Sequence, residues 1–253
     1  MKTASSTNFE HDESRRKPNP RRRGIVDVWN AFMVEGAKFD YGDIPVCPSI
    51  VEKTPQELIS WPEAKLLHKK MLKRGKKDYS HDAFVHFYVD DCKFDGRRCG
   101  IWEYPQEALK VLKHFSGVIT PDFSTNQDFP EPIKIFATYR MRAFGYWLGM
   151  QEIQVVNNVR WGTKETWRYC FSGIPKHSIV SIGTVGGSPR KLCDRSRFET
   201  GFLEMLNRLE PRTIIVVGSA NYPCFIEATK RNIKVIPYKS QTAVAFENGN
   251  RDE

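Results

Sequence analysis

The chain lacks the features that mark a secreted, membrane-spanning or disulfide-linked protein. Its first residues contain no apolar core like that of a signal peptide, and nowhere do about 18 apolar residues run together, as a membrane span requires. The six cysteines form no CxxC pair, so neither a disulfide framework nor a structural zinc site is expected. These absences predict a soluble, cytoplasmic protein with reduced cysteines, at positions Cys47, Cys92, Cys99, Cys170, Cys193 and Cys224.

Familiar catalytic signatures are missing as well. The sequence contains no Walker A pattern, no GxGxxG pattern and no GxSxG nucleophile elbow. A function must therefore be argued from the charge distribution and from the residues at the ends of the predicted strands.

Positive charge is concentrated in two segments of a chain with a net charge of +9. Residues 1–23 hold seven basic and three acidic residues, and residues 65–77 hold seven basic residues and no acid, so the remainder is close to neutral. Such segments are typical of nucleic-acid attachment, but a Lys-rich helix face can equally be a solvated surface, and RRKPNPRRR also matches a nuclear import signal. The cations expected to contact nucleic acid are Arg15, Arg16, Lys17, Arg21, Arg22, Arg23, Lys69, Lys70, Lys73 and Lys76.

Alternating hydrophobic and amphipathic segments predict one α/β domain over residues 24–240. A disordered basic tail of residues 1–23 precedes it and a polar tail of residues 241–253 follows. Strands are expected in VHFYVDD, GVITPDFS, IQVVNNVRWG, SIVSIGTVGG, TIIVVGSA and IKVIPY, with AFMV and IPVC as further candidates. Helices are expected over residues 55–77, broken at Pro62, from Pro105, from about residue 131, from about Pro189 to Leu209, and near Phe225 to Arg231.

The spacing of these strands predicts a largely parallel sheet of βαβ units. In a barrel all strand ends meet at one mouth, whereas in an open doubly wound sheet only the ends beside a switch point meet. Because five successive strands end in polar or glycine-rich residues, we predict a TIM-like barrel, incomplete or distorted near the N-terminus. An open doubly wound three-layer sheet is the alternative.

Several motifs together resemble a domain-of-unknown-function family of bacteria, bacteriophages and mobile elements. They are the strand ends VHFYVDD, GVITPDFS, NVRWG and SIGTVG, with the helix YRMRAFGYWL at residues 139–148 between them. The resemblance covers roughly Val28 to Tyr238 and implies a prokaryotic or phage cytoplasmic setting. It implies no reaction.

Carboxylates follow the first two of the five strands. Asp90 and Asp91 end one strand and Asp122 ends the next, so they are candidate ligands of Mg²⁺ or Mn²⁺, with Asp91 as the metal ligand, or an acid/base pair. Since alternate strand residues face opposite sides, only one of Asp90 and Asp91 is expected to point into the mouth. The alternative is that Asp122 caps a turn and Asp91 is solvated.

The third strand ends in Arg160 and Trp161, which are suited to pairing with a phosphate and stacking on a base. The alternative is a salt bridge between Arg160 and Asp122, with Trp161 in the core. The next strand leads into GTVGGSPR, whose backbone N–H groups are suited to a phosphate, although glycines after a strand more often form a plain βα turn. Together the candidates are Asp90, Asp122 and Arg160 for catalysis and Ser124, Asn157, Trp161, Thr184, Gly186 and Ser219 for ligand binding.

Three functions follow from these patterns. The first is action on a phosphate-bearing ligand, a nucleic acid or nucleotide, at the strand ends, with Mg²⁺ or Mn²⁺ as cofactor if the protein is an enzyme. The second is non-catalytic nucleic-acid binding through the basic tail and the Lys-rich helix. The third is sequestration of a nucleotide without a metal.

Overall fold

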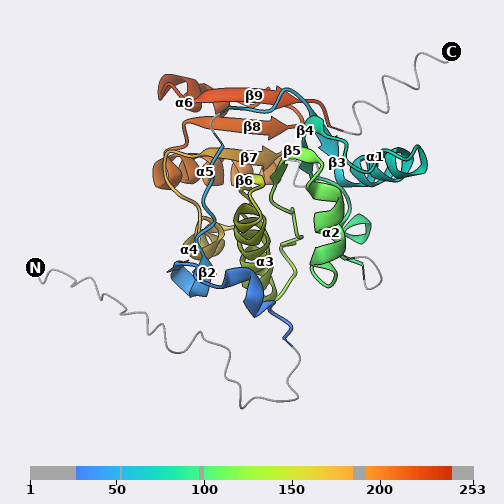
Figure 1. The fold of residues 1–253 in the computed structure, drawn as a ribbon. Helices are drawn as coiled ribbons and strands as arrows, with labels where there is room; N and C mark the ends of the chain where they lie inside the picture. The colour runs from blue at the N-terminus through green and yellow to red at the C-terminus, as the bar shows by residue number, and fades with distance from the viewer. Residues whose placement is uncertain (1–26, 52, 97–99, 185–191, 241–253) are drawn as a thin grey trace, which may run out of the picture.

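The computed structural model describes residues 27–51, 53–96, 100–184 and 192–240. Its main element is a seven-stranded sheet in which every strand is parallel to its neighbours. The strands follow one another in chain order across the sheet (Figure 1): β3 (Leu58–Ser60), β4 (His81–His86), β5 (Phe115–Ile119), β6 (Gln154–Asn158), β7 (Ile179–Gly183), β8 (Thr213–Val217) and β9 (Lys234–Tyr238).

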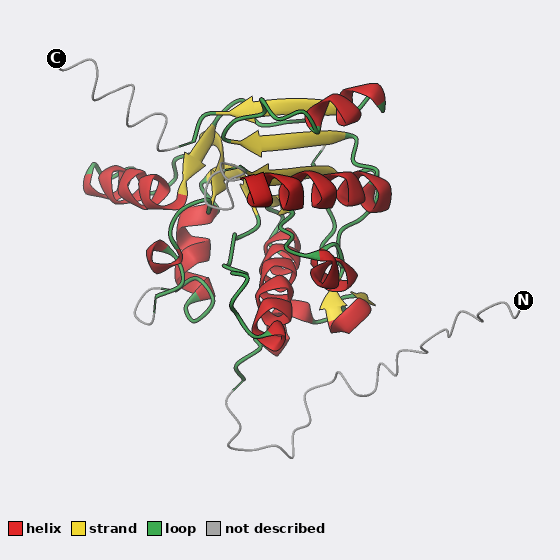
Figure 2. Cartoon of the chain, turned by 180° about the vertical axis from the view of Figure 1, so that it is seen from behind, coloured by secondary structure: helices red, strands yellow, loops and turns green. Residues whose placement is uncertain are grey.

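Helices connect most of these strands (Figure 2). They are α1 (Trp61–Lys73), α2 (Pro105–Leu112), α3 (Glu131–Met150), α4 (Trp167–Cys170), α5 (Leu192–Leu209) and α6 (Phe225–Lys230). A sequential parallel order with right-handed crossovers places the connecting helices on one face, as in a barrel. The prediction of a largely parallel, incomplete barrel is therefore confirmed. No helix in the described ranges is long and apolar enough to span a membrane.

The two faces of the sheet have separate cores because successive strand residues point to opposite sides. On the helix face, Val85, Val118 and Val155 pack in one cluster with α2 and α3, and strands β7 and β8 pack in another cluster with α5 and α6. On the other face, Phe84 and Ile119 join inward residues of β6, β7 and β8. The central strands of the sheet are therefore buried on both sides.

Two aromatic rings occupy the inner face where glycines leave space for them. A Cβ atom on Gly117 would lie 2.4 Å from the ring of Phe84, and one on Gly183 would lie 2.8 Å from the ring of Tyr88. The chain before β3 also contributes to this face, because Val51 is buried against it. This packing brings Tyr88 to the carboxyl ends of the central strands.

The two edges of the sheet are β3 and β9. Strand β3 has three residues, and β9 carries Pro237, which is compatible with an edge because proline lacks an N–H. The Tyr238 hydroxyl donates to the carbonyl of Pro55, so the chain entering β3 contacts the end of β9 although the described strands form no ladder between them.

Helix α1 extends away from the rest of the fold (Figures 1 and 2). Ser60 caps its first turn, since the Ser60 hydroxyl accepts from the Glu63 N–H while the Glu63 carboxylate accepts from the Ser60 N–H. Only Trp61 and Ala64 are buried among its residues. Most of this helix therefore faces solvent.

Near the N-terminus the elements differ from those predicted. The segment AFMV forms a 3₁₀ helix, Ala31–Val34, and IPVC contributes only β2 (Ile44–Pro45), which pairs antiparallel with β1 (Phe39–Asp40) outside the main sheet. The predicted helix from residue 55 starts instead at Trp61, because β3 occupies the preceding residues and Pro62 fits the first helical turn.

Candidate strand-end site

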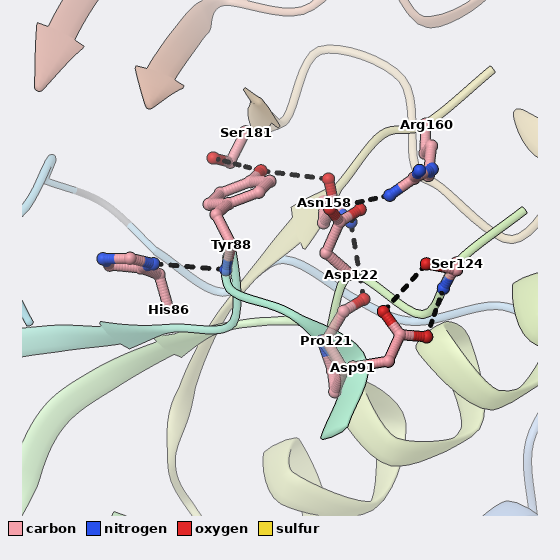
Figure 3. Close-up of polar contacts among 9 residues, drawn as sticks. All are labelled: His86, Tyr88, Asp91, Pro121, Asp122, Ser124, Asn158, Arg160 and Ser181. Atoms are coloured by element: carbon pink, nitrogen blue, oxygen red, sulfur yellow. Dashed lines mark hydrogen bonds and ion pairs between the residues drawn. The ribbon is translucent and has the colours of Figure 1, made fainter. Parts of the chain in front are cut away.

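Polar side chains from four adjacent strands and the residues that follow them gather at the carboxyl ends as one site, in which Asp91 and Ser124 form a hydrogen-bonded pair of their own beside a larger network (Figure 3). We call it the strand-end site: Tyr88, Asp91, Asp122, Ser124, Asn158, Arg160 and Ser181. These side chains come from positions up to 93 residues apart in the chain. The sequence brings them together through the parallel strand order.

The centre of the strand-end site is an ion pair. Arg160 Nη1 donates to Asp122 Oδ2 at 2.8 Å, and Asn158 Nδ2 donates to Asp122 Oδ1 at 2.8 Å. The side chains of Arg160 and Asp122 keep 26% and 18% of their surfaces exposed, so the pair is accessible from solvent. The carboxylate of Asp122, with that of Asp91 nearby, raises the pKa of Arg160, which therefore stays charged.

Asp91 has a different environment from Asp122. Its two oxygens accept from the backbone N–H and the hydroxyl of Ser124, at 3.0 and 2.8 Å. Asp90 precedes it, is exposed, and makes no capping hydrogen bond to the short 3₁₀ helix that follows. Of the two neighbouring carboxylates, Asp91 is the one that lies close enough to raise the pKa of Arg160, and its described hydrogen bonds are to Ser124.

Tyr88 and His86 form the inner wall of the site. The Tyr88 hydroxyl bonds to Asn158 Oδ1 at 2.9 Å and to Ser181 Oγ at 2.8 Å, and burial, together with the Asp122 charge, raises the pKa of Tyr88 well above its ordinary value. Burial lowers the pKa of His86 to about 4, so its Nδ1 accepts from the Tyr88 N–H as a neutral imidazole. Tyr88 is thus a protonated donor at neutral pH.

A buried arginine lies beneath the site. Arg142 of α3 is fully buried and donates to the main-chain carbonyls of Asn158, Cys170 and Ser172. Burial lowers its pKa to about 10, which still leaves it charged at neutral pH. This side chain ties α3 to β6 at the point where β6 enters the site.

Other predicted ligand residues lie away from the network. Asn157 faces the opposite side of β6, where its Nδ2 donates to the carbonyl of Cys47. Trp161 packs against Phe198 and Phe202, and a Cβ atom on Gly201 would lie only 2.1 Å from its ring. This geometry agrees with the alternative prediction, in which Arg160 forms a salt bridge with Asp122 and Trp161 packs in the core.

The remaining predicted ligand residues follow β7 and β8. Thr184 is buried, and its hydroxyl has no hydrogen-bond partner among the residues that the structure describes. Ser219 is exposed, and its hydroxyl accepts from the N–H of Asn221 in a turn. Gly186 lies outside the described residues, as does the basic tail of residues 1–23.

A metal site would have to draw on few protein ligands. In the described ranges no group of three or more His, Cys, Asp and Glu side chains is close enough to hold a metal ion. Mg²⁺ usually keeps several waters and takes one or two carboxylates together with substrate phosphates, so Asp91 and Asp122 remain the candidate ligands. The cofactor stays a prediction.

The fold and this site define a class of α/β protein with an incomplete parallel barrel and polar residues at its strand ends. The chain belongs to the family described as Domain of unknown function (DUF4417), which matches residues 43–239. The predicted resemblance to a phage-associated family of unknown function is confirmed.

Two relatives are phage proteins. The chain is 32% identical over 138 residues to the Gene 1 protein of Mycobacterium phage D29, covering 54% of this chain and 49% of that protein. It is 29% identical over 148 residues to the Gene 1 protein of Mycobacterium phage L5, covering 58% of this chain and 62% of that protein. The chain thus spans about half to three fifths of these relatives' lengths. No solved structure matches it significantly.

Proposed function

We propose that the strand-end site binds a phosphate-bearing ligand the size of a nucleotide, with Arg160 as the phosphate anchor. The observation that supports this most is the unused capacity of Arg160. Within the described structure its guanidinium makes one hydrogen bond, through Nη1, although it carries five N–H donors. A guanidinium group that is held in place, is partly exposed and has unused N–H donors is suited to bidentate pairing with a phosphate.

The surrounding acceptors suit the rest of such a ligand. Asp122 holds one side of Arg160, and carboxylate oxygens accept from sugar hydroxyls or base amino groups. If a divalent ion takes part, Asp122 and Asp91 would hold it and it would neutralise phosphate charge. The site therefore supports binding with or without a metal.

Equilibrium titration of the full chain with AMP, adenosine and inorganic phosphate tests this proposal, each with and without Mg²⁺ or Mn²⁺. We expect AMP to bind more tightly than adenosine, and Arg160→Gln to weaken AMP binding by about 10- to 100-fold, as for loss of a charge-assisted hydrogen bond. Arg168→Gln is the matched control, because Arg168 pairs with Glu131 on the surface.

Two results would contradict the proposal. One is that AMP binds no better than adenosine, and the other is that Arg160→Gln and Arg168→Gln have equal effects. Metal dependence is tested separately with Asp122→Asn, which is expected to remove any Mg²⁺- or Mn²⁺-dependent binding or turnover of the nucleotide while the far-UV circular dichroism stays unchanged.

A second candidate function is nucleic-acid binding through α1 and the turn after it. The observation that favours it is a set of cations without carboxylate partners in the described structure, all exposed on the part of the chain that extends from the fold: Lys69, Lys70, Lys73, Arg74, Lys76 and Lys77. Unpaired cations on a protruding element can reach a phosphate backbone at little cost in desolvation. Neutralising Lys69, Lys70, Lys73 and Lys76 is expected to weaken nucleic-acid binding and reduce its salt dependence, while Arg160→Gln leaves both unchanged.

A further inference from the structure

The hydroxyl of Tyr88 lies in the middle of a hydrogen-bond chain that crosses the strand-end site (Figure 3). Ser181 Oγ lies 2.8 Å on one side of it and Asn158 Oδ1 lies 2.9 Å on the other. The chain continues from Asn158 Nδ2 to Asp122 Oδ1, and Asp122 Oδ2 accepts from Arg160. The ion pair at the surface is thus connected to a buried phenol.

The direction of each hydrogen bond in this chain follows from the groups involved. The buried phenol keeps its proton, because burial raises the pKa of Tyr88. A side-chain amide accepts only through oxygen and donates only through nitrogen. With Tyr88 donating to Asn158 Oδ1, the Asn158 nitrogen must face Asp122, and Ser181 donates to the Tyr88 oxygen in turn. Every donor in the chain therefore points towards the Asp122 carboxylate, an arrangement that is mutually reinforcing.

The Tyr88 ring has little room to move. It lies against Gly183, where a Cβ atom would come within 2.8 Å, and beside the ring of His86 at a centroid distance of 5.8 Å. The phenol oxygen is therefore fixed by packing of its own ring, independently of the ion pair. A phenylalanine at this position would keep the packing and remove only the donor.

We propose that Tyr88 is a positioning residue of the strand-end site, which fixes the Asn158 amide and through it holds Asp122 and Arg160 in the arrangement that receives the ligand. The ligand-binding part of this inference rests on the proposed function. Tyr88 itself need not touch the ligand. Its role differs from that of Arg160, which supplies the donors.

The test compares Tyr88→Phe with Tyr146→Phe in the full chain. Tyr146 is the matched control because its hydroxyl donates to the carbonyl of Glu35, away from the site. The first readout is the ¹⁵N NMR spectrum of the Asn158 side-chain amide and the Arg160 guanidinium, without ligand. The second is AMP affinity, measured also in the Asp122→Asn background.

We expect Tyr88→Phe to shift both sets of side-chain signals and to weaken AMP binding by about tenfold, as for the loss of one buried hydrogen bond. In the Asp122→Asn background the same change should alter affinity by less than about twofold, because the residue through which it acts is gone. Tyr146→Phe should leave both readouts unchanged. Unshifted signals, or a full tenfold loss in both backgrounds, would overturn the inference.

The two readouts separate this inference from the proposed function. If the wild-type chain does not bind AMP, the proposed function fails, and the NMR signals alone decide whether Tyr88 positions the pair. If Tyr88→Phe does not fold, Ser181→Ala removes the donor behind Tyr88 and should shift the Asn158 signals in the same direction but less. Unchanged Asn158 signals in Ser181→Ala would then count against the inference.

Discussion

Neutralising lysines of α1 and of the turn after it is expected to change how nucleic-acid binding depends on salt. The variant carries Gln at Lys69, Lys70, Lys73 and Lys76, which are exposed and without ion pairs in the described structure. Each phosphate contact contributes about 0.9 to the slope of log K against log salt for duplex DNA, and about 0.7 for single strands. If each of the four lysines contacts one phosphate, the slope should therefore fall by about 3.6 on a duplex and by about 2.8 on a single strand.

Fluorescence anisotropy with a labelled duplex and a labelled single strand measures both slopes, between about 50 and 200 mM salt. The matched control carries Gln at four exposed lysines elsewhere, Lys38, Lys53, Lys164 and Lys234, and so has the same net charge. Equal slopes for the two variants would show that only total charge matters. An unchanged slope in the α1 variant would refute the idea that this helix contacts the backbone.

Two further predictions concern stability. Gly201→Ala places a Cβ atom 2.1 Å from the ring of Trp161 and should destabilise the fold by about 1–3 kcal/mol in urea unfolding. The control, Gly149→Ala, has no atom within 4 Å of its new Cβ and should be neutral or stabilising. Equal effects of the two variants would argue against the tight packing of Trp161. Burial lowers the pKa of His86 to about 4, so the unfolded chain binds its proton first and stability should fall by about 3 kcal/mol as pH drops from about 6.5 to 4. His86→Gln should flatten that part of the pH profile, and a profile that keeps its slope would mean that other groups cause it.

The sequence predicted the strands of this fold better than it predicted the N-terminal elements. Strands β5 to β8 are almost entirely buried, as expected for strands covered on both faces, and every strand from β4 to β9 was predicted. Strand β3 was predicted as helix because LIS is short and runs directly into α1. AFMV is equally apolar but packs as a 3₁₀ helix, since its local sequence does not distinguish the two.

For the site, the alternation of side chains along each strand predicted that residues of several strands share a face. It did not show which of two neighbouring residues points into the site. Asp122 and Arg160 were expected at one mouth, and they form an ion pair there. Asn157 was predicted as a ligand residue, yet its neighbour Asn158 joins the network, because only the register of β6 decides which of the two faces inward. Tyr88 was missed although it follows His86 by two residues on the same face, a spacing that periodicity alone can reveal.

The contacts of the buried Arg142 beneath the site could not be predicted from the sequence. Arg142 lies in an apolar helix among aromatic residues, and nothing in the local pattern shows that three main-chain carbonyls will surround it. Those carbonyls belong to residues at or just after the ends of β6 and α4, where the regular hydrogen bonding of the strand and the helix stops. Such a partner set depends on tertiary geometry.

The composition of β9 has a consequence for self-association. The edge strands of an open sheet have unpaired backbone N–H and C=O groups. A strand of another molecule can hydrogen-bond to these groups, which leads to aggregation. In this protein one outer strand contains Pro237 between the exposed Lys234 and Lys239, and the opposite one is three residues long. The barrel can therefore remain open while neither edge strand favours the addition of a strand from another molecule.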